Sequence, residues 1–446
     1  ADRKLEIETR GHVPAPVVTP HGMFVERRWH VDLSPPAHLE PDSPPITEFL
    51  PSVRVGWGVS LESTLARLVD LAADETPLDP RLRAKALEIV GSVPSSAADE
   101  RARLIYRWVV DHVQEDKTGG ETTETDGRRV ITGGTGSRQA AFRYMLRLLG
   151  IESELAIVKD RLAAAPAGKL SEMDPYDALV IRVSTQATPA SQPTARWLIV
   201  KDKFAPYGYI PAEFRGQPAI RLIAGLPRDI VRAPGAADRM SYEGQAELHT
   251  DGSATMDLTV TFEGSLAIAW RSAMDSVPQA KLDDFVESQL VAPSFDGGRV
   301  RSLKVDPTPI DRAFVMHMRI DVPNLAKPVG DGLTMRPAFS PNLQQLATLP
   351  ERHTALLRRA SWHAAVRIRV ILPDSVKAPA RMPQGEVHDG DALVIVHDLA
   401  SGHTITFDRV IELPAERIEP GSEYAAWQKF VRDADGLVSR YVDLPR

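Results

Sequence analysis

The spacing of apolar residues changes twice along the chain, and this change restricts the fold more than any other feature of the sequence. Residues 1–55 and 238–446 carry apolar side chains mostly at alternate positions, the period of β-strands. Residues 60–150 carry them three or four positions apart, the period of α-helices. We therefore predict an α+β fold in three parts: residues 1–55, 56–237 and 238–446.

The first part is rich in proline and contains short alternating runs such as FVERRWHVDL, residues 24–33. Such a pattern predicts two or three strands followed by an extended linker. About fifty residues of this kind are too few to form a core of their own. We expect residues 1–55 to be the tail of a β-rich N-terminal domain, whose front is missing or lies elsewhere.

Three helices are predicted in the second part. Residues 60–73 place their leucines along one side (Leu61, Leu65, Leu68 and Leu71). The next helix has Asp79 as N-cap, Pro80 at its first position and Gly91 just past its end. The third helix follows Ser96 and should bury Leu104, Ile105, Trp108 and Val109. A polar loop over 115–136, a helix, and strands near 154–158, 177–183 and 196–200 complete this part.

The third part reads mostly as strands. Asp251 and Gly252 stand between two alternating runs, which is typical of a hairpin turn. Further strands are predicted at 313–322, 362–373, 392–399 and 403–414, with helical insertions near 277–291 and 341–359 and a last helix near 423–433. We expect a β-sandwich-like domain.

Composition excludes several classes of function. The 446 residues include no cysteine, so the chain has no disulfide, thiolate nucleophile or thiolate metal site. A net charge of -7 argues against general nucleic-acid binding. No apolar run approaches the roughly 18 residues of a membrane span. We expect no cofactor and no transmembrane segment.

The stretch VITGGTGSRQAAFRYMLRLLGIESELAIV, residues 130–158, predicts a glycine-rich loop, a helix and a strand. A helix N-terminus offers free N–H groups and a dipole that favour an anion, so this layout suits a nucleophile. The loop offers Gly134, Thr135, Gly136 and Ser137. It lacks the lysine and spacing of a P-loop, and the glycines are better explained as a tight entry into the helix.

Residues 101–211 resemble the core of the transglutaminase-like superfamily, in its bacterial multi-domain form with flanking β domains. The resemblance rests on ARLIYRWVVDHVQ before the loop, on the glycine loop with its helix and following LLGI, and on KDKFAPYGYIP. It implies a papain/transglutaminase-like central domain and a cysteine–histidine–aspartate site. It also implies a periplasmic, outer-membrane-associated or secreted location.

Carrying these positions over by spacing from Gly150 and Ile151 puts Thr135 at the cysteine position. Ala178 falls at the histidine position and Ile199 at the aspartate position. A shift of two residues would put Ser137 at the nucleophile position instead. Because no histidine occurs between His112 and His249, the usual base is missing. We predict a degenerate site.

The cleft of such a site would be lined by the glycine loop (residues 134–137) together with Asp177, Asp202 and Tyr207. We therefore predict a pseudoenzyme that binds a protein partner or peptide segment, or builds an assembly as one of its subunits. The missing N-terminal part of the same protein is one candidate partner, and an oligomer is another. The competing hypothesis is an amide-bond hydrolase or acyl transferase that uses Thr135 or Ser137. The run His388–Asp391 has metal-ligand residue types, but Asp389 and Gly390 favour a hairpin turn, so we predict no metal site.

Overall fold

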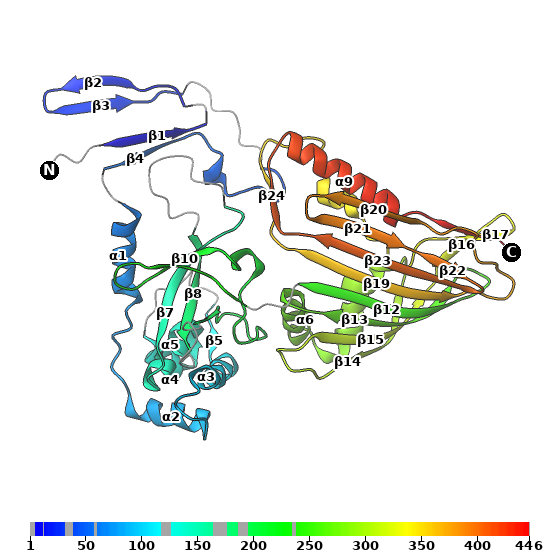
Figure 1. Ribbon diagram of the computed structural model, residues 1–446, viewed down its shortest axis with the longest axis horizontal. Helices are drawn as coiled ribbons and strands as arrows, with labels where there is room; N and C mark the ends of the chain where they lie inside the picture. Colours follow the sequence, from blue (N-terminus) through cyan, green and yellow to red (C-terminus); the bar gives the residue numbers. More distant parts are fainter. Residues whose placement is uncertain are drawn as a thin grey trace, which may run out of the picture.

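The chain has three parts in the computed structural model, and Figure 1 shows the N-terminal strands beside a helix-rich body and a large sheet. The structure describes residues 5–11, 13–31, 39–57, 60–116, 126–163, 176–185, 195–233 and 238–445. Much of the polar loop predicted at 115–136 lies outside these ranges, as does the side chain of Asp177. Helices and strands mix in an α+β architecture with a large β-rich C-terminal region, as predicted.

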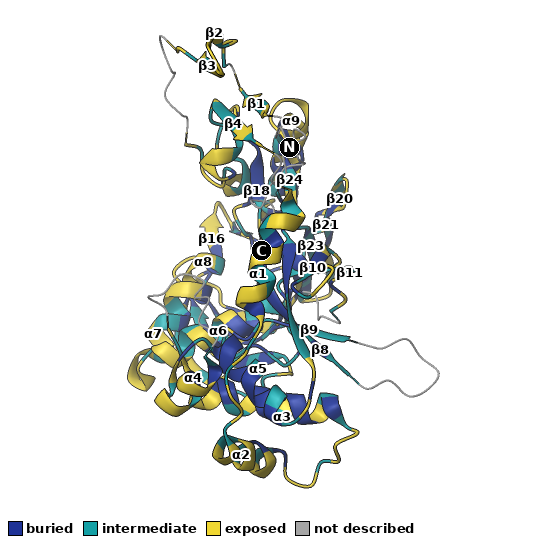
Figure 2. Cartoon of the chain, turned by 90° about the vertical axis from the view of Figure 1, so that its left-hand side faces the viewer, coloured by how far each residue is buried: buried dark blue, intermediate teal, exposed yellow. Residues whose placement is uncertain are grey.

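The N-terminal segment forms two separate two-stranded antiparallel sheets. One pairs β1 (Glu6–Arg10) with β4 (Ser52–Gly56), and the other pairs β2 (Val17–His21) with β3 (Phe24–Arg28). Figure 2 shows this segment mostly in the colours of exposed and intermediate residues. Several apolar side chains stay in water, among them Val17 at 67% and Phe24 at 74% exposure. The short turn η1 (Ile46–Glu48) precedes β4.

The first helices of the central part begin and end where the sequence predicts. Helix α2 (Pro80–Val90) is capped by Asp79, whose carboxylate accepts the N–H of Arg81, and it ends at Gly91 with a positive φ of 53°. Helix α3 is Ala98–His112. Helix α1 (Leu61–Ala72) buries Leu65, but Leu71 is 53% exposed, so the predicted leucine face is narrower than expected.

Residues 126–136, which we predicted as part of a loop, form a helix and a short strand. Asp126 accepts the N–H of Arg129 and begins helix α4 (Gly127–Gly133), which the sequence analysis missed. After α4, the short strand β6 (Thr135–Gly136) leads into helix α5 (Arg138–Leu148), and it pairs in parallel with β5 (Gln114–Glu115), which follows α3. A side chain on Gly127 would collide with the backbone of Ala140 at 2.4 Å, so glycine is required where α4 crosses α5.

A five-stranded sheet with the order β11-β10-β7-β8-β9 completes the central part. The pairs within it are antiparallel. Its strands are β7 (Ser153–Lys159), β8 (Tyr176–Ser184), β9 (Ala195–Leu198), β10 (Pro218–Arg221) and β11 (Arg228–Ile230), with η2 (Ala212–Phe214) before β10. Helices α3 and α5 pack with β8 and β9 into one hydrophobic core that includes Ile105, Phe142 and Val183.

The C-terminal part is built on one nine-stranded sheet with the order β14-β15-β13-β12-β19-β23-β21-β20, and β22 also pairs with β23. All neighbours are antiparallel except β12 and β19, which are parallel. The predicted turn at Asp251-Gly252 joins β12 to β13. The hairpin predicted at Asp389-Gly390 also forms, one residue later: Asp389 ends β20, and Gly390 and Asp391 make the turn to β21. The strands are β12 (Arg239–Leu248), β13 (Ala254–Phe262), β14 (Arg299–Val305), β15 (Phe314–Val322), β19 (Trp362–Ile371), β20 (Gln384–Asp389), β21 (Ala392–His397), β22 (Leu399–Ser401) and β23 (Thr404–Leu413).

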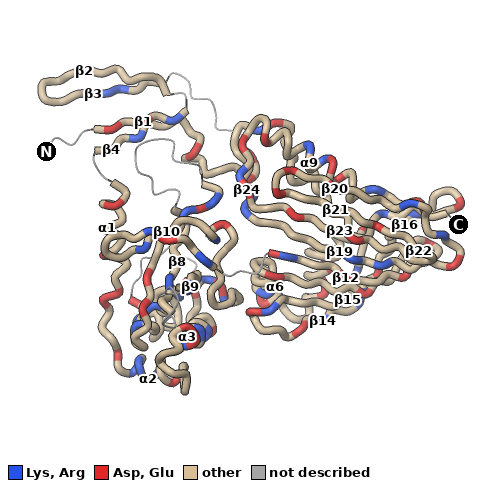
Figure 3. The backbone as a smooth tube through the Cα atoms, in the orientation of Figure 1, with Lys and Arg blue, Asp and Glu red and all other residues tan. Residues whose placement is uncertain are grey.

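This arrangement differs from the β-sandwich-like domain that we predicted. Burial alternates along β13 and β23, so one face of the sheet is buried and the other meets solvent. The buried face packs against helices and a three-stranded sheet in one core, rather than against a second sheet of similar size. Figure 3 shows basic and acidic residues interspersed along these strands.

The covering elements include helices and short strands. They are α6 (Ser265–Ser276), η3 (Gln279–Lys281), α7 (Leu282–Val286), η4 (Glu287–Val291), α8 (Ala292–Ser294), β16 (Ala326–Val329), β17 (Gly332–Met335), β25 (Val442–Leu444) and α9 (Ser422–Val438). The helix predicted at 341–359 is wrong. Only η5 (Leu343–Ala347) forms there, and the chain continues to β18 (Leu356–Arg358), which pairs with β24 (Glu416–Ile418). Pro350, without an N–H, interrupts any longer helix.

Candidate functional site

The glycine loop before α5 is shaped by the two helices that it joins. Gly134 ends α4 in the left-handed conformation, with φ 70°. Ser137 caps α5, and its hydroxyl oxygen accepts the N–H of Ala140 at 3.3 Å. Thr135 is exposed, whereas Gly136 is buried. The hydroxyl of Ser137 is therefore engaged as an N-cap.

A carboxylate of the protein itself occupies the N-terminus of α5. Glu115 Oε2 accepts the N–H of Arg138 at 2.9 Å. Burial raises the pKa of Glu115, although this hydrogen bond and the charge of Arg138 oppose the shift. The position that would favour an anionic ligand is thus filled from within the chain.

The first two residues of α5 are hydrogen-bonded to three neighbouring segments of the chain. Arg138 is 8% exposed and donates to the carbonyl oxygens of Val113 at 2.7 Å and Lys201 at 2.6 Å. Gln139 donates to the carbonyl oxygen of Leu179 at 3.3 Å. The structure therefore brings the loop at Thr135 close to the segments that carry Ala178 and Ile199.

Ala178 and Ile199 themselves contribute only apolar surface. Both belong to one hydrophobic cluster, in which Ala178 is buried and Ile199 is partly buried. Trp197, Ile210 and Phe214 are neighbours in the same cluster. An apolar cluster cannot orient an imidazole or hold a proton next to a hydroxyl.

His112 is the one histidine of the described part of residues 60–233. Its ring stacks on Trp108 with 4.7 Å between ring centroids, and its Nδ1 lies 2.9 Å from the carbonyl oxygen of Trp108. The imidazole thus lies back against the preceding turn of α3. Local packing on Trp108 is therefore a sufficient structural role for His112.

The remaining predicted cleft residues have defined structural partners. Asp202 accepts the N–H of Phe204 at 2.8 Å in a turn. The hydroxyl of Tyr207 donates to Asp99 at 3.0 Å, and Asp99 also pairs with Arg196 at 2.7 Å. Burial, with the nearby charge of Asp99, raises the pKa of Tyr207. Tyr207 therefore stays protonated and holds the loop to α3.

A cavity of about 260 Å³ lies between the central and C-terminal parts and is lined partly by residues 206–210. Tyr207, which we predicted in the cleft of the degenerate site, is among the lining residues of this cavity. Its opposite wall comes from residues 263–268 and from the loop 310–313. Thr135 and Ser137 are not among its lining residues. The glycine loop and this cavity are therefore separate features.

A second set of polar side chains, which the sequence analysis missed, lies on the open face of the large sheet. Thr259 Oγ1 lies 3.0 Å from His317 Nδ1, and His317 Nε2 lies 3.2 Å from Asp306 Oδ2. Thr259 and His317 are direct cross-strand partners on β13 and β15. Because the two residues are 58 positions apart in the sequence, no local sequence pattern indicates that they meet. The side chains of His317 and Asp306 keep 43% and 32% exposure.

Metal ligands do not gather anywhere in the described ranges, where no group of three or more histidine or acidic side chains could hold an ion. His388 contacts Glu386 on β20, and the residues that follow form the turn to β21. None of the helices in the described part of the chain is long and apolar enough to cross a membrane.

Comparison with known proteins gives a fold-level match. No family model matches the chain, and no curated protein matches it. The crystal structure of a protein from Parabacteroides distasonis ATCC 8503, described as a putative protease, has a similar fold with a TM-score of 0.55. The match covers 99% of this chain and 70% of that chain at 12% sequence identity. At that identity the likeness concerns the fold alone.

Proposed function

We propose that the chain is a non-catalytic protein with a transglutaminase-like central domain, and that it acts as a binding or structural subunit in a bacterial envelope or extracellular assembly. The loop–helix–strand order of α5 and β7 and the antiparallel β7-β8-β9 sheet support the resemblance. The proposed degenerate positions are Thr135, Ala178 and Ile199.

One observation supports the proposal that catalysis has been lost. The N-terminus of α5, where a nucleophile and its developing charge would sit, is closed by Glu115 at 2.9 Å from the N–H of Arg138. A negative carboxylate there repels an oxyanion, and the apolar cluster of Ala178 and Ile199 supplies no base.

The N-terminal strands support a binding role. Two-stranded sheets are marginal in water unless another element covers them. Sheets β1–β4 and β2–β3 expose apolar side chains, including Phe24 at 74%. Among the described strands, neither sheet has a third member, and short sheets with exposed apolar side chains suit pairing with strands of another protein segment.

The native mass of the purified protein, measured together with identification of co-purifying chains, tests this proposal. We expect a complex of defined stoichiometry well above the 48.9 kDa of one chain. A 48.9 kDa monomer that hydrolyses acyl donors would overturn the proposal.

The alternative with Thr135 or Ser137 as nucleophile has weaker support. A hydroxyl needs a base within hydrogen-bond reach, roughly 2.6–3.2 Å. The hydroxyl of Ser137 instead accepts the N–H of Ala140, and Thr135 is exposed at the start of β6.

A second enzymatic candidate is favoured by the hydroxyl–imidazole–carboxylate chain of Thr259, His317 and Asp306. This order is the one that activates hydroxyl nucleophiles for acyl transfer. We rank it second because half-exposed side chains on an open sheet leave water in the site and screen its charges. Hydrolysis of p-nitrophenyl acetate that disappears in both Thr259→Ala and His317→Ala would establish it, and equal rates in all three proteins would remove it.

A further inference from the structure

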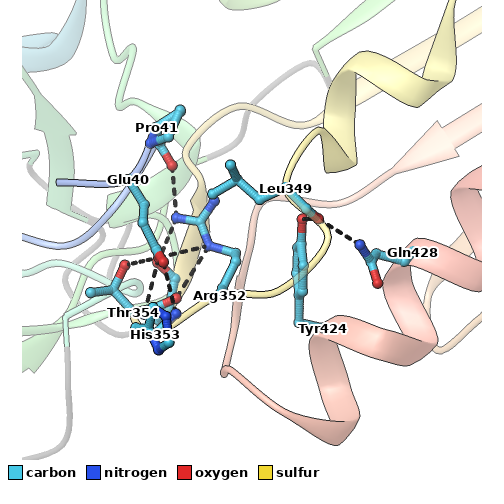
Figure 4. Close-up of polar contacts among 9 residues, drawn as sticks. Glu40, Pro41, Leu349, Arg352, His353, Thr354, Tyr424 and Gln428 are labelled. Carbon is cyan, nitrogen blue, oxygen red and sulfur yellow. Dashed lines mark hydrogen bonds and ion pairs between the residues drawn. The ribbon is translucent and has the colours of Figure 1, made fainter. Parts of the chain in front are cut away.

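The segment that follows the N-terminal hairpin lies on the C-terminal part, and Glu40 enters a polar cradle there. Glu40 Oε2 accepts the hydroxyl of Thr354 at 2.5 Å and its N–H at 3.0 Å, while Oε1 accepts the N–H of His353 at 2.8 Å. Figure 4 shows these donors converging on one carboxylate. Only 8% of the Glu40 side chain is exposed. Such a cradle selects a carboxylate by its geometry.

Arg352 forms the floor of the cradle. Its side chain is 3% exposed, and its guanidinium lies 3.5 Å from Glu40 Oε2 and donates to the carbonyl oxygen of Pro41 at 2.7 Å. Burial alone would raise the pKa of Glu40, but the hydrogen bonds from Thr354 and His353 and the charge of Arg352 hold that pKa below its ordinary value. The carboxylate is therefore bound in its charged form.

Helix α9 fixes the loop that provides these donors. The hydroxyl of Tyr424 donates to the carbonyl oxygen of Leu349 at 2.7 Å, and Gln428 donates to the same oxygen at 2.6 Å. The guanidinium of Arg352 also lies over the Tyr424 ring, 5.7 Å from its centroid. The cradle is thus held by the folded C-terminal part rather than shaped by Glu40 alone.

Two further contacts continue along the same segment. The N–H of Leu357 in β18 donates to the carbonyl oxygen of Asp42 at 2.8 Å, and β18 pairs with β24. Glu48 then meets Arg417 of β24 at 2.8 Å. The C-terminal part therefore contacts a first carboxylate, two backbone carbonyls and a second carboxylate in sequence.

We propose that this surface, formed by residues 352–358 and Arg417, is a peptide-binding site for acidic segments, occupied in this chain by its own residues 40–48. These residues bind in a folded form, with a turn at Pro41 and Asp42 and the 3-10 helix η1 at Ile46–Glu48. The carboxylate followed by proline confers specificity, and the hydrogen bonds to the carbonyl oxygens of Pro41 and Asp42 give affinity that does not depend on the side chains there. The inference concerns a different surface from the glycine loop and does not depend on the loss of catalysis.

Hydrogen exchange of the full-length protein tests whether this surface holds residues 40–48 through the charge of Glu40. In Glu40→Gln, the amides of His353, Thr354 and Leu357 should exchange about tenfold faster than in the wild-type chain, because the segment loses its charged anchor. The matched control is Glu351→Gln, which changes an exposed neighbouring carboxylate that is not in the cradle. Unchanged protection of β19 and β23 amides would confirm that the variant is folded.

A peptide with the sequence of residues 39–50, LEPDSPPITEFL, provides the second arm. At about 1 mM, the range of effective concentration of a tethered segment, it should restore protection to the Glu40→Gln chain. The same peptide with glutamine in place of the glutamate at position 40 should not. Unchanged exchange in Glu40→Gln, or released amides that the peptide fails to protect, would overturn the proposal.

Discussion

At the scale of single residues, the loop before α5 contains two hydroxyls with different roles. Ser137 satisfies the N–H of Ala140, one of the otherwise unpaired donors at the helix start, whereas Thr135 is exposed in β6. The two hydroxyls should therefore contribute differently to the free energy of unfolding.

Ser137→Ala should lower the free energy of unfolding by about 1 kcal/mol, the usual cost of losing an N-cap. Thr135→Ala should change it by less than about 0.5 kcal/mol, as for an exposed substitution. Urea denaturation of both variants beside the wild type gives the comparison. Equal losses would mean that Ser137 is not acting as a cap.

Glu115 makes the stability depend on pH. Burial raises its folded pKa above the ordinary 4.5, so the native state binds this proton more tightly than the unfolded state does. Stability from this group is therefore fully present below 4.5 and falls as pH rises from there through the folded pKa.

Glu115→Gln removes the charge and keeps an oxygen that can accept the N–H of Arg138. The free energy of unfolding of the variant, minus that of the wild type, should increase with pH across this window and then level off. Thermal unfolding at a series of pH values measures it. A difference that stays flat or decreases would show that the carboxylate is not held in a buried, unfavourable environment.

At the scale of elements, a buried ion pair attaches α9 to the large sheet. Asp398 lies between β21 and β22, and its carboxylate accepts from Arg409 at 2.5 Å, with both side chains at most 1% exposed. Arg409 also donates to the carbonyl oxygen of Val438 at 2.6 Å, the last residue of α9. One side chain thus joins the sheet to the C-terminus of the helix.

Asp398→Asn should destabilise the protein by about 3–5 kcal/mol, because it leaves a buried guanidinium without its counter-charge. The matched exposed pair is Arg367 and Asp408, 2.7 Å apart, where the Arg367 side chain is 71% exposed. Asp408→Asn should cost less than about 1 kcal/mol. Chemical denaturation of the two variants measures these losses of stability. Losses of similar size would contradict the claim that burial makes the Asp398–Arg409 pair more important.

Local chemistry accounts for the elements that the sequence predicted correctly. Asp79, Pro80 and Gly91 mark α2 because a cap, a fixed φ and a left-handed residue act within one turn. The alternation along 362–373 and 403–414 likewise predicts β19 and β23. Helix α4 was missed because its cap, Asp126, follows a long polar run without an apolar period.

Features that form only when distant segments of the chain meet could not be predicted from local sequence patterns. The Glu40 cradle connects residues more than 300 positions apart, and the pair Thr259 and His317 depends on the register of β13 against β15. The large sheet has one buried and one polar face, and alternation alone cannot tell whether helices or a second sheet cover the buried face. That choice depends on packing of the whole chain.

At the scale of the whole molecule, Arg417 connects all three parts. It pairs with Glu48 of the N-terminal segment and donates to the carbonyl oxygen of Leu162 in the central part at 3.1 Å. Lys203 and Asp275 of α6 form a second, exposed link at 2.9 Å. The partly buried link at Arg417 should contribute more to the relative position of the parts.

Arg417→Ala should therefore increase the radius of gyration in small-angle scattering and raise cleavage near residues 39–50 in limited proteolysis. Lys203→Ala should change neither, because an exposed ion pair contributes little. An Arg417→Ala chain with wild-type scattering and cleavage would show that the parts are held elsewhere.

The absence of a working nucleophile is the central claim, and the intact mass of the protein after incubation with a reactive acyl donor tests it most directly. We expect no acyl adduct on Thr135 or Ser137, and the same mass in Thr135→Ala and Ser137→Ala. A stoichiometric adduct that maps to either hydroxyl and is lost in the corresponding variant would contradict the account.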